Sequence, residues 1–185
     1  MASIKGFQMK NIKKTLGREG EGCIASLYLN GKIIGIYEDY GDGGMEDVNY
    51  VSKDAEKEMM KVIIEFAKEY KNDFIIDLYK QRPEQFKSEC ERFKTHYPYI
   101  PDEDITIQTM ASNSIVYIVS EFLNLWELEK QYKKYSKKGY KAISVNKEKN
   151  GLTTITAYPN DWSDEIIKEK AKNNKVYFSL NDFII

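Results

Sequence analysis

The dipeptide Asn30-Gly31 is the feature of this sequence that most constrains the fold. β-prone runs flank it on both sides, and Asn-Gly tolerates the two positive φ angles that a type I′ turn requires. The preceding run alternates between two faces, which predicts a half-buried strand with one face formed by Cys23, Ala25, Leu27 and Leu29. The return strand is predicted over residues 32–40. The pairing of these two strands is therefore specified locally.

Four helices are predicted from capping residues and from apolar side chains at helical spacing. They begin at Ser52, at Pro83, at Ser112 or Ser114, and at Ser163, and they end near Asn72, Tyr97, Lys138 and Asn173. The third is the predicted core helix, because it carries the longest stripe of large apolar residues. Residues 74–79 are apolar and partly β-branched, which predicts a short strand, with the start of a helix as the alternative.

The remaining segments complete an α+β prediction. A ragged strand is predicted over residues 4–14, then a glycine-rich loop over 17–22, and later a hairpin that turns at Asn150-Gly151. A last strand is predicted over residues 176–180. The predicted fold class is α+β, with two β-hairpins at opposite ends of the chain packed with about four helices and a mixed or antiparallel sheet. We expect a main domain over residues 1–138 and a C-terminal hairpin-helix-strand module over residues 139–185, either separate or packed into the same domain.

The cysteines indicate a reducing environment, and the hydropathy pattern indicates the absence of a membrane segment. The only cysteines, Cys23 and Cys90, lie far apart, with no clustered histidine, so neither a disulfide framework nor a zinc site is predicted. No uncharged apolar run approaches the roughly 18 residues of a membrane span. We therefore expect a cytoplasmic protein without a membrane segment, a metal or a cofactor.

Charge is distributed unevenly along the chain, although the formal net charge is only -1. Residues 38–58 contain eight acids and two lysines, whereas residues 128–149 contain eight lysines and two acids. A net charge near zero predicts no general attraction to nucleic acid, but either segment could form a local binding surface.

The acidic segment is the first candidate binding site. Its five candidate partner-binding residues are Glu38, Asp39, Asp42, Glu46 and Asp47. Three interpretations are open: a solvated turn, a site for Mg²⁺ or Ca²⁺, and a recognition loop for an arginine-rich partner. The spacing does not match an EF-hand, because Tyr40 and three glycines occupy the interval. These glycines also give the loop a backbone freedom that the strands do not require.

The lysine-rich segment is the second candidate. Its candidate nucleic-acid-binding residues are Lys130, Lys133, Lys134, Lys137, Lys138 and Lys141, interleaved with Tyr132, Tyr135 and Tyr140. Lysines that meet phosphates and rings that stack on bases are typical of a nucleic-acid contact. The alternative is structural, because lysines at a helix C-terminus stabilise the helix dipole.

No catalytic residues are predicted. His96 is the only histidine, and neither cysteine has a neighbouring base in the sequence, so a nucleophilic system is not indicated. Both cysteines are interpreted as small hydrophobic residues, and His96 as an ordinary surface or half-buried histidine.

The first hairpin and its loop resemble a signature found in small proteins of phages and mobile elements. In that signature L-Y-x-x-G-K-x-x-G, matched by residues 27–35, precedes an acidic D-x-G-x-G-G loop, matched by residues 39–44. The end of the chain is also similar, with a turn at Tyr158-Pro159, a helix and a terminal strand. The chain departs from the commoner loop by carrying Tyr40 between the first acid and Gly41.

The sequence as a whole is similar to anti-CRISPR proteins that act against type II-A Cas9. The resemblance implies a non-enzymatic protein that binds Cas9 with its guide RNA in the bacterial host, with the acidic loop competing for arginine-rich surfaces. The alternative within this resemblance is that the lysine-rich end contacts guide RNA or DNA in the complex. The alternatives are a nucleic-acid-binding accessory protein of a mobile element and, third, a metal-dependent enzyme.

Overall fold

The computed structural model describes residues 1–43, 47–147, 153–172 and 174–185. The chain forms two compact units. The large unit comprises Lys5–Ser120, and the small unit comprises Met1–Ile4 together with Glu121–Ile185. The predicted division into domains of residues 1–138 and 139–185 stays a prediction.

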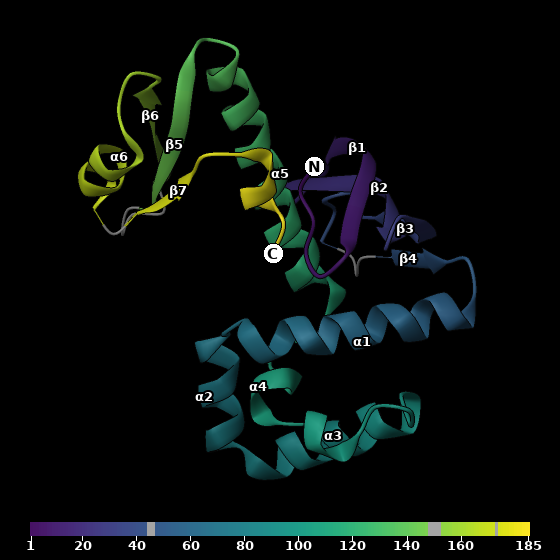
Figure 1. Cartoon of the computed structure of the whole chain (residues 1–185). Helices are drawn as coiled ribbons and strands as arrows, with labels where there is room; N and C mark the ends of the chain where they lie inside the picture. The colour runs from purple at the N-terminus through teal and green to yellow at the C-terminus, as the bar shows by residue number, and fades with distance from the viewer. Residues whose placement is uncertain (44–46, 148–152, 173) are drawn as a thin grey trace. The chain divides into compact units, whose positions relative to one another are not determined.

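A four-stranded antiparallel sheet begins the large unit (Figure 1). Its strands are β1 (Phe7–Leu16), β2 (Glu21–Leu29), β3 (Lys32–Glu38) and β4 (Asp47–Tyr50), and they lie in chain order. Asn30 and Gly31 have φ angles of 49° and 79°, which confirms the predicted hairpin turn. The ragged first strand is confirmed over slightly later residues, with an irregularity between Lys10 and Lys13. β4 was not predicted from the sequence.

One face of the sheet is buried under the helix α1 (Lys53–Glu69). The predicted alternation on β2 is confirmed, and the buried face is the one formed by Cys23, Ala25, Leu27 and Leu29. Ser52 caps α1 as predicted, because its side chain accepts a hydrogen bond from the backbone N–H of Ala55 at 3.1 Å. The side chains of Met59 and Ile63 on α1 are buried as well.

The strand predicted over residues 74–79 is wrong, because these residues belong to the helix α2 (Asp73–Gln81). Asn72 is the N-cap, and its side chain accepts a hydrogen bond from the backbone N–H of Ile75 at 3.3 Å. The short apolar run fits either type of element, and capping decides in favour of the helix. The helix leaves Phe74 78% exposed while it buries Tyr79.

The other helices of the large unit follow α2. They are α3 (Pro83–His96), which begins at Pro83 as predicted, the 3-10 turn η1 (Asp102–Asp104) and the one-turn α4 (Ile107–Met110). α4 lies against α1 and α2 (Figure 1). The predicted core helix is α5 (Ile115–Ser136), which begins in the large unit and continues in the small one. Its predicted stripe contains four buried side chains, those of Ile118, Val119, Phe122 and Leu125.

The small unit contains an antiparallel sheet in the order β6-β5-β7, together with most of α5. Its elements are β5 (Tyr140–Lys147), β6 (Thr153–Pro159), α6 (Asp164–Ala171), β7 (Lys175–Tyr177) and the 3-10 turn η2 (Leu180–Phe183). α5 ends at Ser136, and Gly139, with φ 86°, closes the turn that leads into β5, whereas Ser163 caps α6. The predicted turn at Asn150-Gly151 lies outside the described residues.

The protein is α+β, as predicted from the sequence. The described residues form six α-helices instead of about four; the two additional helices are α2, predicted as a strand, and the single turn α4. Across these same residues, none of the helices has both the length and the apolar character needed to cross a membrane.

Candidate functional site

Two loops interlock at one end of the large sheet, where β1, β2 and β3 bring distant residues together. The loop between β1 and β2 meets the loop after β3 through the backbone N–H of Glu19, which donates to the carbonyl of Gly41 at 2.8 Å. Thr15 Oγ1 donates to the carbonyl of Asp39 at 2.7 Å. The acidic loop is therefore held by main-chain and side-chain hydrogen bonds to a segment more than 20 residues earlier.

One glycine in each loop, Gly17 and Gly41, is required by this close approach. Gly41 has a φ of 72°, and a Cβ there would overlap the carbonyl oxygen of Gly20. A Cβ on Gly17 would overlap the carbonyl oxygen of Tyr40. The interpretation of residues 17–22 as a loop is confirmed for residues 17–20, whereas residues 21 and 22 begin β2. The interpretation of the later glycines as unneeded by the fold is wrong for Gly41, because a side chain there would overlap the backbone of the other loop. Gly44 lies outside the described residues.

Two of the predicted partner-binding acids have a local structural role. Asp39 Oδ1 accepts a hydrogen bond from the backbone N–H of Gly41, and Asp42 Oδ1 accepts one from the backbone N–H of Arg18, both at 2.8 Å. Their carboxylates therefore satisfy loop N–H groups that would otherwise depend on water.

The other predicted acids differ in how they are held. Glu38 accepts hydrogen bonds from the hydroxyl of Tyr40 and the amide of Asn49, each at 3.1 Å. Asp47 lies directly across from Glu38 in the β3–β4 register and is exposed. Among described residues, no donor reaches the Asp47 side chain. Glu46 lies outside the described residues.

Exposed apolar groups accompany these acids at what we call the acidic end. We define it by Leu16, Glu19, Glu21, Glu38, Asp39, Tyr40, Asp42 and Asp47. Leu16 is 83% exposed and Tyr40 is 54% exposed. The hydrogen bond to Glu38, its charge and that of Asp47 raise the pKa of the Tyr40 hydroxyl, which therefore stays protonated at neutral pH. Sequence reasoning missed the contributions of Leu16, Glu19 and Glu21, because only the β1–β2 pairing brings them to this end.

The described residues contain no group of three or more His, Cys, Asp or Glu side chains arranged to hold a metal ion. Cys23 is buried, as interpreted from the sequence. Its burial and the charge of Asp39 raise the thiol pKa to about 11, although Lys14 opposes the shift. Burial, together with the charges of Glu89 and Glu91, also raises the thiol pKa of Cys90. Both thiols are therefore poor nucleophiles at neutral pH.

Ion pairs neutralise part of the predicted lysine-rich site. Lys130 lies 3.2 Å from Glu127 and also over the ring of Trp126. Lys133 lies 2.5 Å from Glu129. Lys141 lies 2.6 Å from Asp164. Lys134, Lys137 and Lys138 are exposed, and in the parts of the chain that the structure describes they form no ion pair.

Glu129 is the buried member of these pairs. Burial alone would raise its pKa, but hydrogen bonds from Lys133 and from the backbone N–H of Ala2, at 2.6 Å, lower it overall. Lys133 therefore compensates an internal charge. Its neighbour Tyr132 is also structural, because its hydroxyl donates to the carbonyl of Phe178 at 2.7 Å.

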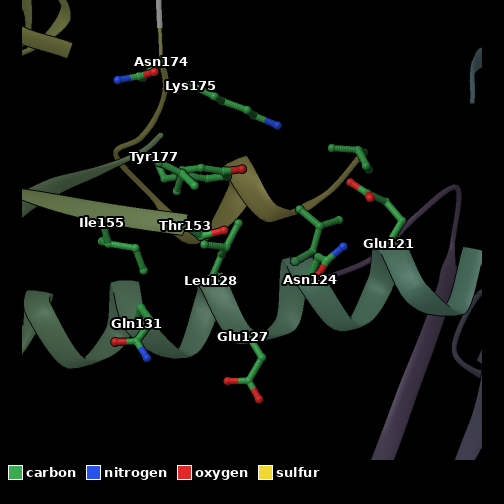
Figure 2. A pocket seen from close by; sticks show the side chains of 13 residues that line it. Glu121, Asn124, Glu127, Leu128, Gln131, Thr153, Ile155, Asn174, Lys175 and Tyr177 are labelled. Carbon is green, nitrogen blue, oxygen red and sulfur yellow. The ribbon is translucent and has the colours of Figure 1, made fainter. Parts of the chain in front are cut away.

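A cleft of about 570 Å³ lies between α5 and the sheet of the small unit (Figure 2). Leu128 extends from α5 toward the strands, whereas Glu127 points away. Tyr177 lines this cleft. Its pKa is raised mainly by burial and further by the charges of Glu121 and Asp182. The lining comes from α5, β5, β6, β7 and the chain end, so no single sequence motif marks it.

Comparisons with protein-family models, with curated proteins and with solved structures found no match for this chain. The resemblance to phage and mobile-element proteins stays a prediction from the sequence.

Proposed function

We propose that this chain is a non-enzymatic binding protein whose acidic end contacts a basic surface of a protein partner. One observation carries the proposal: the interlocked loops hold acids around two exposed apolar side chains, Leu16 and Tyr40. Interfaces commonly combine an apolar centre with a charged rim, and complementary charge favours rapid and specific association. Because the backbone of these loops is already fixed by their close packing, the surface also loses little conformational freedom on binding.

The partner class follows from the sequence resemblance. We propose that the protein inhibits a host defence nuclease of the type II-A Cas9 class, on behalf of a phage or mobile element. Cas9 presents arginine-rich surfaces to the PAM duplex and to the guide-target channel, and these are suitable partners for a carboxylate-rich end.

A pull-down with guide-loaded and empty Cas9, followed by a DNA cleavage assay, tests the proposal. We expect the protein to bind Cas9 and to slow cleavage when it is present in molar excess. Failure to bind and to slow cleavage would reject the Cas9 assignment.

Charge variants then locate the contact. In the double variant Glu21→Gln and Asp47→Asn, both acids are exposed and neither side chain bonds to another described residue, so the fold should be unchanged. We expect inhibition to require about 10-fold more protein. The matched control is Glu84→Gln with Glu103→Gln, which removes two exposed acids from α3 and η1. Equal effects of the two pairs would place the contact elsewhere.

A nucleic-acid contact is the second candidate function, because Lys134, Lys137 and Lys138 are exposed beside the packed rings of Tyr135 and Tyr140. Binding to a generic duplex and to single strands, measured against salt concentration, tests it. Replacement of the three lysines by alanine should weaken binding and reduce the salt dependence. No detectable binding at low salt would remove this candidate.

A further inference from the structure

Strand β4 is an edge of the large sheet, because it pairs with β3 on one side and ends the strand order (Figure 1). The backbone N–H of Val51 donates to the carbonyl of Ile34 at 3.0 Å, in the same register that pairs Asn49 with Ile36. Main-chain groups point alternately to the two sides of a strand. The N–H and C=O groups of Val48 and Tyr50 therefore point away from β3, toward the outer edge.

An aromatic cleft of about 380 Å³ lies beside this edge, on the sheet face that α1 covers. Val48 and Tyr50 contribute from β4, and Phe93 and Tyr97 contribute from α3. Ile63 of α1, which is buried, also lines it. The cleft can therefore accept apolar side chains that approach from the edge of β4.

The opposite face of β4 has a different character. Asp47 and Asn49 are exposed there, and Glu38 lies across from Asp47 on β3. A strand placed along β4 would direct alternate side chains to these two faces. Its inward side chains would meet aromatic rings, and its outward side chains would meet carboxylates.

We propose that β4 binds an extended peptide segment of a protein partner, in which basic and apolar residues alternate. The segment would add a strand to the sheet by pairing with Val48 and Tyr50, as in other cases of β-strand addition. The apolar residues would enter the aromatic cleft, and the basic residues would lie beside Asp47 and Glu38. This inference rests on the proposed function as a protein-binding module, and it names the type of segment that is bound.

The first test uses a fluorescent eight-residue peptide in which lysine and valine alternate. Its control has the same composition arranged as four lysines followed by four valines. Fluorescence anisotropy should show at least 10-fold tighter binding of the alternating peptide. Two further peptides carry N-methyl groups on alternate amides, one on the odd and the other on the even positions. Only one of these sets of N–H groups pairs with β4, so methylation of that set should abolish the preference and methylation of the other set should not. Equal binding of alternating, block and both methylated peptides would overturn the inference and indicate attraction by charge alone.

The second test changes the protein. Val48→Pro removes an outward N–H that does not bond to β3, and proline is tolerated at such edge positions. Val48→Thr retains the N–H and the β-branched shape as the matched control. We expect the proline variant to lose at least 10-fold in affinity for the alternating peptide, whereas the threonine variant stays close to wild type. Circular dichroism shows whether each variant is folded, and if the proline variant is not, the methylated peptides decide.

The outcomes separate this inference from the Cas9 proposal. If Cas9 binds but the alternating peptide shows no preference, the strand-addition inference is wrong and the Cas9 proposal stands. If the peptide binds as expected but Cas9 does not, the partner assignment fails and the edge site stands. A dimer in solution that Val48→Pro abolishes would instead assign the edge to a second copy of this chain.

Discussion

The acidic end of the large unit and the lysine-rich end of α5 both concentrate charge, but their side chains are held in different ways. At the acidic end, Glu38, Asp39 and Asp42 accept hydrogen bonds from main-chain and side-chain donors. Leu16 and Tyr40 remain exposed there. At the lysine-rich end, three of six candidate lysines pair with nearby acids. The number of like charges in a segment therefore does not measure the unpaired charge that the segment presents to a partner.

The largest effect is expected from Gly41→Ala, which disrupts the interlocked loops. The substitution combines a strained positive φ with overlap against the carbonyl of Gly20, and it should lower the free energy of unfolding by about 2–3 kcal/mol. Urea denaturation measures the change. Gly31→Ala is the matched control, because its φ is also positive but no atom lies within 4 Å of the added Cβ. Equal losses in both variants would contradict the interlocking.

A somewhat smaller effect is expected from Glu129→Gln at the lysine-rich end. The amide keeps an acceptor for Ala2 but loses the charge that pairs with Lys133, so the free energy of unfolding at pH 7 should fall by about 1–3 kcal/mol. Because the folded-state pKa of Glu129 is lowered, its stabilising contribution is present above about pH 4.5 and is lost as the pH falls below that value. The variant should lose less stability than wild type between pH 5 and pH 3. Urea denaturation at each pH measures this. If the two proteins lose the same free energy of unfolding between pH 5 and pH 3, this role of Glu129 is rejected.

Asp42→Ala should have a moderate effect, since it removes the acceptor for the Arg18 N–H. We expect a loss of about 0.5–1.5 kcal/mol in the free energy of unfolding. Asp47→Ala, which removes an exposed acid without a hydrogen bond from any described donor, should change it by less than about 0.5 kcal/mol. Thermal denaturation of both variants measures the difference. If Asp47→Ala lowers the free energy of unfolding more than Asp42→Ala does, the assignment of the loop contacts is wrong.

The smallest effect is expected from Lys134→Ala, which should change the free energy of unfolding by less than about 0.5 kcal/mol. Lys133→Ala is its counterpart on the same turn of α5, and it should cost more stability because it removes one of the two cations that pair with the buried Glu129, the other being the ammonium group of Met1. Both are measured by urea denaturation. Indistinguishable values would show that the two lysines are equally exposed to solvent.

Local patterns predict well the parts of the fold that are decided locally. The Asn30-Gly31 turn, the inward side chains of β2, the Ser52 cap and the stripe of α5 all follow from neighbouring residues. The strand prediction for the segment that forms α2 was wrong, because a short apolar run fits both a strand and a helix. β4 was missed because its four residues are too few to establish an alternation.

The candidate site was only partly predictable. The acids after β3 are visible in the sequence, but their hydrogen bonds to the loop after β1 depend on the pairing of three strands. Similarly, the burial of Glu129 depends on residues at the beginning of the chain. Both contacts join residues far apart in sequence, and periodicity within a short window carries no information about them.

The strand order of the large sheet also has a consequence for the order of folding. β1, β2 and β3 are consecutive antiparallel neighbours, and the interlocked loops lie entirely within residues 7–43. The side-chain hydrogen bonds between these loops span 24 residues, against 127 for the Ala2–Glu129 bond, so closing them costs less entropy and they form earlier. The acidic end can therefore assemble while the ribosome is still adding the helices, before any lysine of α5 has been synthesised.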